Sequence, residues 1–544
     1  MGVPMGCDLV PIPVLCEAKE GVFELGPGMS VQPSAGLEKE AALLAGWLSG
    51  IEGVGQVGIS RALGAASSIT NARAAGFTGD GGSVSRADSA RAPVANAATS
   101  ISLSLDPGMQ RAEEYELGIA PQGIRIAAKD AAGIVRGASS LYQLALSQGR
   151  ALRSLRIQDW PRFAWRGFML DCARNFFRVE FIEKLLDLAA LHKLNVFHWH
   201  LADDQAWRLE IASKPELTGR GAFRQDMRYE IEWEKGGFYT RADVTRVVEY
   251  AAARHIMVVP EIETPGHSTA LLASHPEFSC RGASDPSVLF KPEDHYGIFE
   301  DILCAGNDRV LAFMDEVLDD VCAMFPGEYV HMGGDEAPKA RWLSCPACKS
   351  RMDALGMRKG GGQYEPERLQ AWFMGRMAEM LTRRGKRMIG WDEVLEGGIQ
   401  KDTLIMSWRG AEPGVRAASL GYDVVMCPQT KACYLDHKQF DVPEEPGHLG
   451  VCTLKDSYNF DPVPDGLREE EAAHILGGQA NLWSELVYFG RQAEYMLFPR
   501  LCALSEVFWS PRENRDFDDF SARLATHTQR LDMLDVLYCR GKYF

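Results

Sequence analysis

Residues 329–342, YVHMGGDEAPKARW, hold a short apolar run that ends in two glycines, two adjacent acids and, soon after, a proline. The apolar run is typical of a buried strand, and the glycines let the backbone bend and let another molecule approach closely. Asp335 and Glu336 then place two like charges side by side at the strand end. This position is poor for such a pair unless something uses the two carboxylates, so the stretch is a candidate functional site.

Apolar runs of this kind recur along the chain, and there are eight of them. They are RGFMLD (166–171), LNVFHWH (194–200), IMVVPEIE (256–263), YVHMGGD (329–335), RMIGWD (387–392), TLIMSW (403–408), DVVMCP (423–428) and HILGGQ (474–479). Continuous apolar runs suit strands buried on both faces, as in parallel sheets. Helical patterns separate most of them, and the first connection, VEFIEKLLDLAALHKL (179–194), has apolar residues at helical spacing. Eight strands with helical crossovers over about 350 residues predict an α/β fold, a (β/α)8 TIM barrel.

The chain before the barrel has a different pattern. Its strand-like runs alternate with the two-residue period of half-buried strands, and a helix is expected at about 132–148; the runs are GVFELG (21–26), TSISLSL (99–105), YELGIA (115–120) and GIRIAA (123–128). A stretch rich in alanine, serine and glycine at 62–100 predicts a flexible loop. Residues 1–157 are therefore predicted to form a small N-terminal α/β domain.

The remaining divisions follow from this arrangement. The barrel is predicted over 158–510, and residues 511–544 are expected to be a closing helix and tail. A long proline-rich segment, 437–470, joins the last two strands and is expected to cap the barrel.

The bulk composition excludes some functions. The formal net charge of −16 argues against binding the phosphate backbone of a nucleic acid. No stretch of eighteen apolar residues occurs, so no membrane span is expected. The first residues lack the pattern of a convincing signal peptide, which predicts a cytoplasmic protein or the mature form of a secreted one.

The cysteines give a further expectation. The chain has 13, an odd number, scattered as in proteins of a reducing compartment. Cys345 and Cys348, in CPAC, have metal-ligand spacing, but a zinc site needs two more ligands and no second CxxC exists. Free thiols or a local disulfide are therefore preferred to a metal, and no cofactor is expected.

In a TIM barrel the functional residues lie at the carboxyl ends of the strands. Nearly every predicted end carries an acid, an aromatic residue or both, and Trp391, Trp408 and Trp483 come from three different ends. Taken singly, each such residue is more simply explained as core or as part of a rim ion pair. Together, flat indoles with acids and Arg174 between them form what a sugar ring needs: stacking faces and partners for its hydroxyls. A carbohydrate substrate is the expected partner.

The acid pair now has a possible role. A glycosidase needs an acid to protonate the leaving oxygen, but adjacent residues cannot flank one scissile bond. One of them can be the donor, and the neighbouring negative charge would raise the pKa of that donor.

The motifs LDCARN, NVFHWHLADDQAWR, PEIETPGHS, HMGGDE, GWDE and NLWSE resemble those of glycoside hydrolase family 20, the β-N-acetylhexosaminidases, from about residue 110 to the C-terminus. The resemblance implies a retaining exo-glycosidase that removes terminal β-linked GlcNAc and/or GalNAc. In that family the 2-acetamido oxygen of the substrate is the nucleophile, which is an exception to the two-carboxylate scheme.

The resemblance also implies residue roles. Glu336 would be the general acid and then the base, and Asp335 would orient the acetamido group and support the oxazolinium charge. The other implied roles are an acetamido hydrogen bond from Tyr434, pocket walls from Trp391, Trp408 and Trp483, hydroxyl contacts from Arg174, Asp436 and Glu485, and a polar chain of Asp203 and His267 that supports Glu336. One departure is visible: Glu263 stands where the family usually has aspartate, which puts its contacts in doubt.

Three alternatives remain open. His198 and His200 could be the ligand pair of a metal-dependent amidohydrolase, because alternate strand residues share a face. A non-catalytic sugar-binding protein could use the same scaffold, although loss of Asp335 or Glu336 would then be expected. An ordinary double-displacement glycosidase would need a nucleophile from another strand about 5 Å from Glu336.

Overall fold

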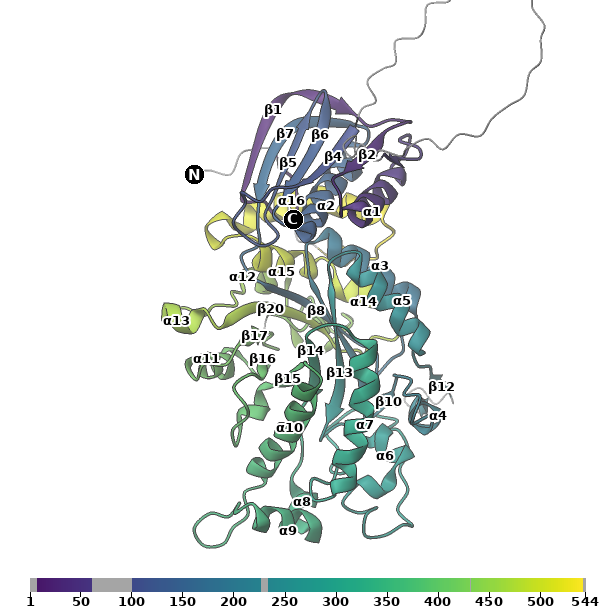
Figure 1. Cartoon of the computed structure of the whole chain (residues 1–544), viewed down its shortest axis with the longest axis vertical. Coiled ribbons are helices and arrows are strands. Elements are labelled where there is room, and N and C mark those ends of the chain that lie inside the picture. Colours follow the sequence, from purple (N-terminus) through teal and green to yellow (C-terminus); the bar gives the residue numbers. More distant parts are fainter. Residues whose placement is uncertain (1–6, 61–99, 227–232, 431, 542–544) are drawn as a thin grey trace, which may run out of the picture.

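The computed structural model describes residues 7–60, 100–226, 233–430 and 432–541. Figure 1 shows a small sheet-and-helix domain stacked on one end of a larger barrel. The predicted loop at 62–100 lies outside the described residues, except for Ser100, where a strand begins.

The N-terminal domain is a seven-stranded mixed sheet with two helices. Its strands, in the order β1-β7-β5-β6-β4-β2-β3, are β1 (Leu15–Glu24), β7 (Ala151–Asp159), β5 (Tyr115–Ala120), β6 (Gly123–Ala128), β4 (Ser100–Leu105), β2 (Ser30–Pro33) and β3 (Gly58–Ile59). Along β5, Tyr115, Leu117 and Ile119 are buried while the residues between them are partly exposed. The predicted period of two therefore reflects a sheet with one covered face.

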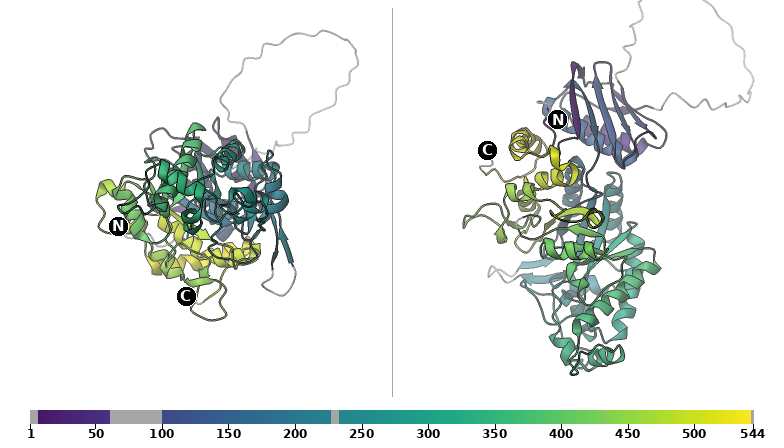
Figure 2. Two further views of the ribbon diagram at one scale, coloured as in Figure 1. Left: turned by 90° about the horizontal axis from the view of Figure 1, so that it is seen from below. Right: turned by 90° about the vertical axis from the view of Figure 1, so that its left-hand side faces the viewer.

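The helices α1 (Glu38–Ser49) and α2 (Ala131–Gln148) accompany this sheet. The buried helix α2 also contacts the barrel, because Ser139 Oγ donates to Ala190 O at 2.8 Å and Arg136 Nη2 donates to His255 O at 3.0 Å. The right-hand view of Figure 2 shows the small domain stacked on this end of the barrel.

The barrel closes as predicted, with eight parallel strands at the predicted positions. They are β8 (Trp165–Asp171), β9 (Val196–Asp203), β13 (Met257–Thr264), β14 (Tyr329–Gly333), β15 (Arg387–Trp391), β16 (Leu404–Ser407), β17 (Val424–Met426) and β20 (Ile475–Leu482). The first strand, β8, pairs with both β9 and β20, which closes the ring. All seven residues of β8 are buried, as expected for a strand covered on both faces.

Helices surround these strands. The main ones are α3 (Val179–Leu191), α5 (Arg241–Ala252), α7 (Asp308–Met324), α10 (Pro366–Arg383), α11 (Ala411–Ser419), α14 (Gly490–Leu497) and α15 (Arg500–Trp509). In α3, Ile182, Leu185, Leu186 and Ala189 are buried on one face, as the sequence predicts. Between β15 and β16 the crossover is only the short helix η2 (Asp392–Leu395).

Longer insertions follow several strands. The short elements β10 (Ala206–Trp207), α4 (Glu216–Gly221), β11 (Phe223–Asp226) and β12 (Trp233–Gly236) follow β9; α6 (Thr269–Ser274) and η1 (Pro276–Phe278) follow β13; α8 (Ala340–Ser344) and α9 (Pro346–Ala354) follow β14; and β18 (His437–Lys438), β19 (His448–Val451), α12 (Leu454–Asn459) and α13 (Glu469–Ala472) lie between β17 and β20. The insertions after β9, β13 and β14 and the first part of the segment after β17 lie at the carboxyl ends of the strands, whereas α12 packs on α15 and α13 directly precedes β20.

The last helix, α16 (Phe517–Met533), follows η3 (Arg512–Asn514) and packs against the small domain. Arg530 Nε donates to Gln143 O on α2 at 2.9 Å, and Arg523 Nη1 donates to Leu9 O at 2.7 Å. Among the described helices, none combines the length and apolar character that a membrane crossing requires.

Candidate active site

A pocket of about 280 Å³ opens at the carboxyl ends of the barrel strands, close to the lower limit for small-molecule sites. It is lined by Arg174, His267, Tyr296, Gly297, Ile298, Asp335, Glu336, Trp391, Trp408, Gln429, Tyr434, Asp436, His437, His448, Trp483 and Glu485. Ten of the eleven residues singled out from the sequence are in this set, and the remaining one, Asp203, lies behind Arg174. The structure thus brings together residues from separate strand ends.

The two glycines of the GGDE stretch are needed for a tight turn. Gly333 and Gly334 have φ of 66° and 98°, in the left-handed region, and a Cβ on Gly333 would lie 1.8 Å from Glu263 Oε1. The same carboxyl oxygen accepts the N–H of Gly334 at 3.0 Å. Glu263 therefore holds this turn directly. Burial, together with the charge of Asp335, raises its pKa well above the usual value.

The turn delivers two acids with different surroundings. The Glu336 side chain is 34% exposed and its backbone has a φ of 44°, an uncommon conformation for a residue other than glycine. The Asp335 side chain is 13% exposed, and its buried Oδ1 has no hydrogen-bond partner among the described residues. Burial is the main cause that raises the pKa of Asp335 to about 6, with a further contribution from the charges of Glu261 and Glu336. The sequence predicts that the neighbouring charge raises the pKa of the proton donor; in the structure the raised pKa is that of Asp335, and burial is its main cause.

His267 connects these acids to a second strand end. Its Nε2 lies 3.4 Å from Glu336 Oε2 and 4.0 Å from Asp335 Oδ2, while Nδ1 lies 2.9 Å from Asp204 Oδ2. Burial opposes a charge on the ring, but the acids around it, Asp203 first, raise the pKa of His267 well above its usual value. The supporting chain therefore runs from Asp204 through His267 to Glu336, with Asp203 at 3.6 Å from Nδ1.

Arg174 is fixed where the barrel closes. Its Nη2 lies 2.7 Å from Asp203 Oδ2, and its guanidinium carbon lies 5.0 Å from the centre of the Trp483 ring. Asp171 accepts the backbone N–H groups of Arg174 and of Ser484, both at 3.0 Å, and so ties the end of β8 to the end of β20. Charged and backbone contacts thus hold the guanidinium at the pocket wall before any ligand binds.

Aromatic rings form much of the remaining wall. Trp408 and Tyr434 stand nearly parallel, 15° apart with ring centres 6.4 Å apart, and Trp483 lies 6.2 Å from Tyr434 and 5.9 Å from Trp391. The Nε1 of Trp408 donates to Glu393 Oε2 at 2.8 Å, which fixes that ring. This shape suits a flat apolar face flanked by polar groups, the pattern of a sugar ring.

Two more acids face the pocket beside Arg174. Burial, and next the charge of Glu485, raises the pKa of Asp436 well above its usual value, and Asp436 Oδ1 has no hydrogen-bond partner among the described residues.

His437 and His448, from the segment between β17 and β20, line the same pocket. That segment therefore reaches the rim, as the sequence predicts.

The histidines of β9 do not face the pocket. His198 Nε2 lies 3.0 Å from Glu261 Oε2, and His200 contacts both Glu261 and Asp203. Burial and the two acids have opposite effects on the pKa of His200; the acids dominate and raise it to about 10. Both histidines are paired with acids and neither lines the pocket, so the amidohydrolase alternative, whose metal must meet the substrate, has no support here.

Several residues of the site were missed in the sequence. Asp204 follows β9 in the turn to β10, so its side chain points toward His267 while that of Asp203 turns to Arg174. Glu261 sits in the PEIE run and contacts three histidines and Trp391 beneath the pocket floor. Tyr296 comes from a connection without regular pattern, where no sequence signal indicates a pocket residue.

A larger hollow, about 560 Å³, lies at the opposite end of the barrel. Its lining includes Trp165, Val196, Met257 and Tyr329, which are first residues of strands, and Arg136 of the small domain. In TIM barrels that face serves stability and chemistry sits at the other. The carboxyl-end pocket is therefore the candidate site.

An aromatic pocket lined with acids at the carboxyl end of a TIM barrel is the construction of a carbohydrate-processing site. Residues 163–512 match "Glycosyl hydrolase family 20, catalytic domain", and residues 6–160 match "Glycosyl hydrolase family 20, domain 2". The chain belongs to glycosyl hydrolase family 20.

Individual relatives agree. The chain is 39% identical over 449 residues to a "Beta-hexosaminidase" of Porphyromonas gingivalis, with 80% of this chain and 56% of that protein covered. It is 37% identical over 407 residues to a "Beta-hexosaminidase" of Vibrio furnissii, with 72% and 64% covered. The match thus spans less than two thirds of each of these relatives.

A solved structure matches over the whole chain. The GH20 exo β-N-acetylglucosaminidase of Vibrio harveyi, in complex with N-acetylglucosamine, is 30% identical and superimposes with a TM-score of 0.82. The match covers 100% of this chain and 80% of that one.

Proposed function

We propose that this protein is a β-N-acetylhexosaminidase that removes terminal non-reducing β-linked GlcNAc and/or GalNAc from glycans or glycoconjugates by substrate-assisted catalysis. The observation that carries the proposal is the pair of acids at one pocket wall: Glu336 is partly exposed, and Asp335 is more enclosed, with a buried oxygen that lacks a partner among the described residues. A buried carboxylate oxygen without a partner requires a donor, and the acetamido N–H of the substrate supplies one.

The roles follow from this arrangement. Glu336 gives its proton to the glycosidic oxygen while the acetamido oxygen attacks the anomeric carbon. Asp335 accepts the acetamido N–H and stabilises the positive charge that develops on the oxazolinium ring. Tyr434, which lines the same pocket beside Trp408 and Trp483, donates to the acetamido oxygen. Glu336 then takes a proton from a water molecule as the water oxygen attacks the anomeric carbon. This attack opens the oxazolinium ring and restores the β configuration.

The remaining pocket residues hold the sugar. Arg174, Asp436 and Glu485 offer charged partners to its hydroxyls, and the three tryptophans enclose its apolar faces. The names of the curated relatives and the N-acetylglucosamine complex of the Vibrio harveyi enzyme support this class of substrate.

The test compares aryl glycosides that share one leaving group. The 4-nitrophenyl β-glycosides of GlcNAc and GalNAc should be cleaved, and the glucoside, which has a hydroxyl in place of the acetamido group, should be cleaved very poorly. A thiazoline that mimics the cyclised sugar should inhibit strongly, because the site favours the state that develops charge. Asp335→Asn should weaken both effects.

Double displacement is the competing mechanism, since Asp436 and Glu485 also face the pocket. Mass spectrometry after incubation with a 2-fluoro glycoside separates the two. A stable glycosyl adduct on any carboxylate would replace the substrate-assisted mechanism with the two-carboxylate one.

A further inference from the structure

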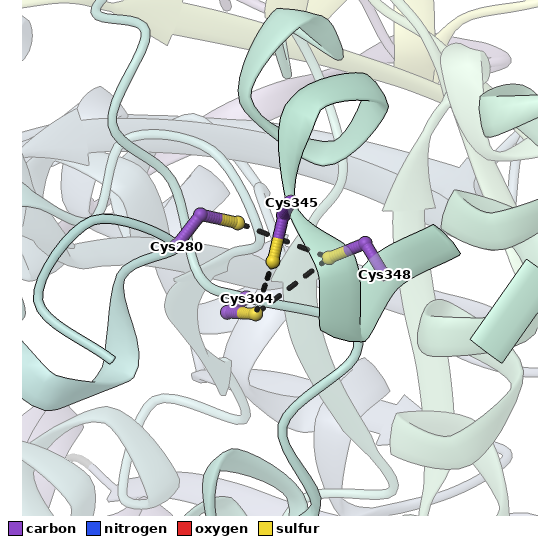
Figure 3. Close-up of side chains that lie close together, drawn as sticks. All are labelled: Cys280, Cys304, Cys345 and Cys348. Atoms are coloured by element: carbon purple, nitrogen blue, oxygen red, sulfur yellow. Dashed lines mark hydrogen bonds between the residues drawn. The ribbon is translucent and has the colours of Figure 1, made fainter. Parts of the chain in front are cut away.

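Four cysteines meet at one point outside the pocket. Their Sγ atoms all lie within 4.8 Å of one another, and they belong to Cys280, Cys304, Cys345 and Cys348. Figure 3 shows the four side chains converging from separate segments of the chain. The sequence has no second CxxC pair to accompany CPAC, but two single cysteines distant in the chain take that place.

The spacing of the sulfurs fits a tetrahedral metal. The recorded Sγ–Sγ distances are 3.8 Å for Cys280–Cys348, 3.8 Å for Cys304–Cys345 and 3.6 Å for Cys304–Cys348. Zn–S bonds of about 2.3 Å at tetrahedral angles separate two sulfurs by about 3.8 Å. A disulfide would bring a pair to about 2.05 Å. All thirteen cysteines of the chain are unpaired in this structure.

The cluster is shielded from solvent. Cys304 and Cys348 are 0% exposed, Cys345 is 7% exposed and Cys280 is 9% exposed. A structural zinc site takes four protein ligands and leaves no open position, and such burial suits a closed site of that kind.

Backbone contacts fix the segments that carry these thiols. Cys304 N donates to Phe278 O at 2.8 Å, which holds the two ends of the segment between Cys280 and Cys304 together. A Cβ on Gly306 would lie 2.3 Å from the carbonyl carbon of Ala347, so only glycine allows this approach to the start of α9.

The helix itself favours thiolates at this position. Cys345 is the N-cap of α9 and Cys348 lies in its first turn, where the positive end of the helix dipole stabilises negative charge.

We propose that Cys280, Cys304, Cys345 and Cys348 bind one Zn²⁺ ion as a structural tetrathiolate site. Binding replaces four thiol protons, which leave for solvent, with one divalent ion. The site is separate from the candidate active site, and none of its four residues lines that pocket.

The ion would join two loops that both serve the pocket. Cys280 and Cys304 belong to the connection after β13, which carries His267, and the CPAC pair belongs to the connection after β14, which carries Glu336. The segment between Cys280 and Cys304 also supplies Tyr296, which lines the pocket. The ion should therefore stabilise the pocket rim without touching substrate.

The metal content of the intact protein tests the proposal directly. The full chain, purified without a metal-affinity step and without chelator, should contain about one zinc per chain by plasma mass spectrometry. Cys304→Ser and Cys348→Ser should each lose the metal. Cys322→Ser is the matched control, because Cys322 lies on α7, partly buried and outside the cluster, so this variant should keep the zinc.

Two further measurements keep the test decisive if a serine variant fails to fold. A mercurial that titrates thiols in the native protein should release the zinc, detected with a chromogenic chelator. Cobalt exchanged into the site should give the visible bands of tetrahedral thiolate coordination. Either result supports the site.

The proposal is overturned if the reduced chain holds no metal and takes up neither zinc nor cobalt. It is also overturned if mass spectrometry of the freshly isolated protein finds the four cysteines joined as two disulfides. Neither readout depends on glycosidase activity, so failure here and failure of the proposed function are distinguishable.

Discussion

His267 reaches Glu336 from the end of a neighbouring strand, with its Nε2 3.4 Å from Glu336 Oε2. The backbone of His267 has a φ of 46°, in the left-handed region. Asp204 Oδ2 lies 2.9 Å from the other ring nitrogen, Nδ1. The general acid proposed here is therefore placed by a contact between two connections, one after β13 and one after β14.

Asp204→Asn should lower kcat about tenfold, because a hydrogen bond between charged groups contributes about 1.5 kcal/mol or more. Loss of the Asp204 charge should also lower the pKa of His267, so the alkaline limb of the rate profile should move to lower pH. Thr269→Val is the matched control. It removes the hydroxyl that donates to Asp204 at 2.6 Å but keeps the charge of Asp204. An unchanged alkaline limb in Asp204→Asn would make the contact merely structural.

Glu336→Gln should lower turnover of a natural glycan by roughly two to four orders of magnitude, the usual contribution of a positioned acid–base group. The loss should be smaller for an aryl leaving group, which departs without a proton. Steady-state kinetics on chitobiose and on the 4-nitrophenyl glycoside measure the difference. Equal, minor losses on both substrates would remove Glu336 from this role.

The pKa of Asp335, raised to about 6, predicts a fall in kcat/KM on acidification. The proposed chemistry needs the ionised carboxylate, so the rate should drop about tenfold per pH unit below that value. The effect on stability has a defined sign: a carboxyl with a raised folded-state pKa favours the folded state at low pH, and this contribution is lost as pH rises from about 4 to about 6.

A pH profile of kcat/KM measures the acidic limb. Trp408→Phe, which carries no proton, should keep the limb in place. Asp335→Asn should have a much lower kcat/KM, and its profile should lack the acidic limb. A limb that persists near pH 6 in Asp335→Asn belongs to another group.

Trp483→Ala should weaken substrate binding by about 1 kcal/mol or more, on the scale of aromatic contacts. The loss should appear mainly in KM, because the ring both faces the pocket and supports Arg174 at 5.0 Å. Trp483→Phe keeps an aromatic face and should recover part of the affinity. If KM is unchanged in the alanine variant, the ring is a core residue.

Glu263→Asp should be harmful, although it keeps the carboxyl group. The shorter side chain cannot reach Gly334 N–H, so the turn that positions Asp335 and Glu336 loses a hydrogen bond of about 1 kcal/mol. We expect a lower melting temperature and a several-fold lower kcat, with Glu263→Gln closer to wild type. An aspartate variant as stable and active as the parent would contradict this account of the turn.

The eight barrel strands could be predicted because each is a buried apolar run bounded by polar residues, a signal that tertiary context does not alter. The strand β1 was harder to predict from the sequence. It begins at Leu15, before the predicted run, and its first half carries a register irregularity between Ala18 and Val22 among charged residues. The helix α1 has Leu44 and Leu48 buried at helical spacing, but so short a pattern did not predict it.

The pocket residues could be predicted because all strand ends of a barrel meet at one rim. The contacts between them could not, since a one-residue difference decides direction at a turn: Asp203 ends β9 and faces Arg174, while Asp204 faces His267. The cysteine cluster could not be predicted from the sequence for a related reason. Cys280 and Cys304 are isolated in the sequence, and only the fold brings them to the CPAC pair.

The hydrogen bond from Ser484 N to Asp171 spans 313 residues of sequence and sits where the first and last strands of the barrel meet. Contacts of such long range add to the contact order that slows folding. The binding wall made by Arg174 and Trp483 joins the ends of these two strands, so it requires β8 and β20 to be paired. A ligand seated there selects the native state over every species in which β8 and β20 have separated, so amide protons in these two strands should exchange more slowly when an inhibitor is bound.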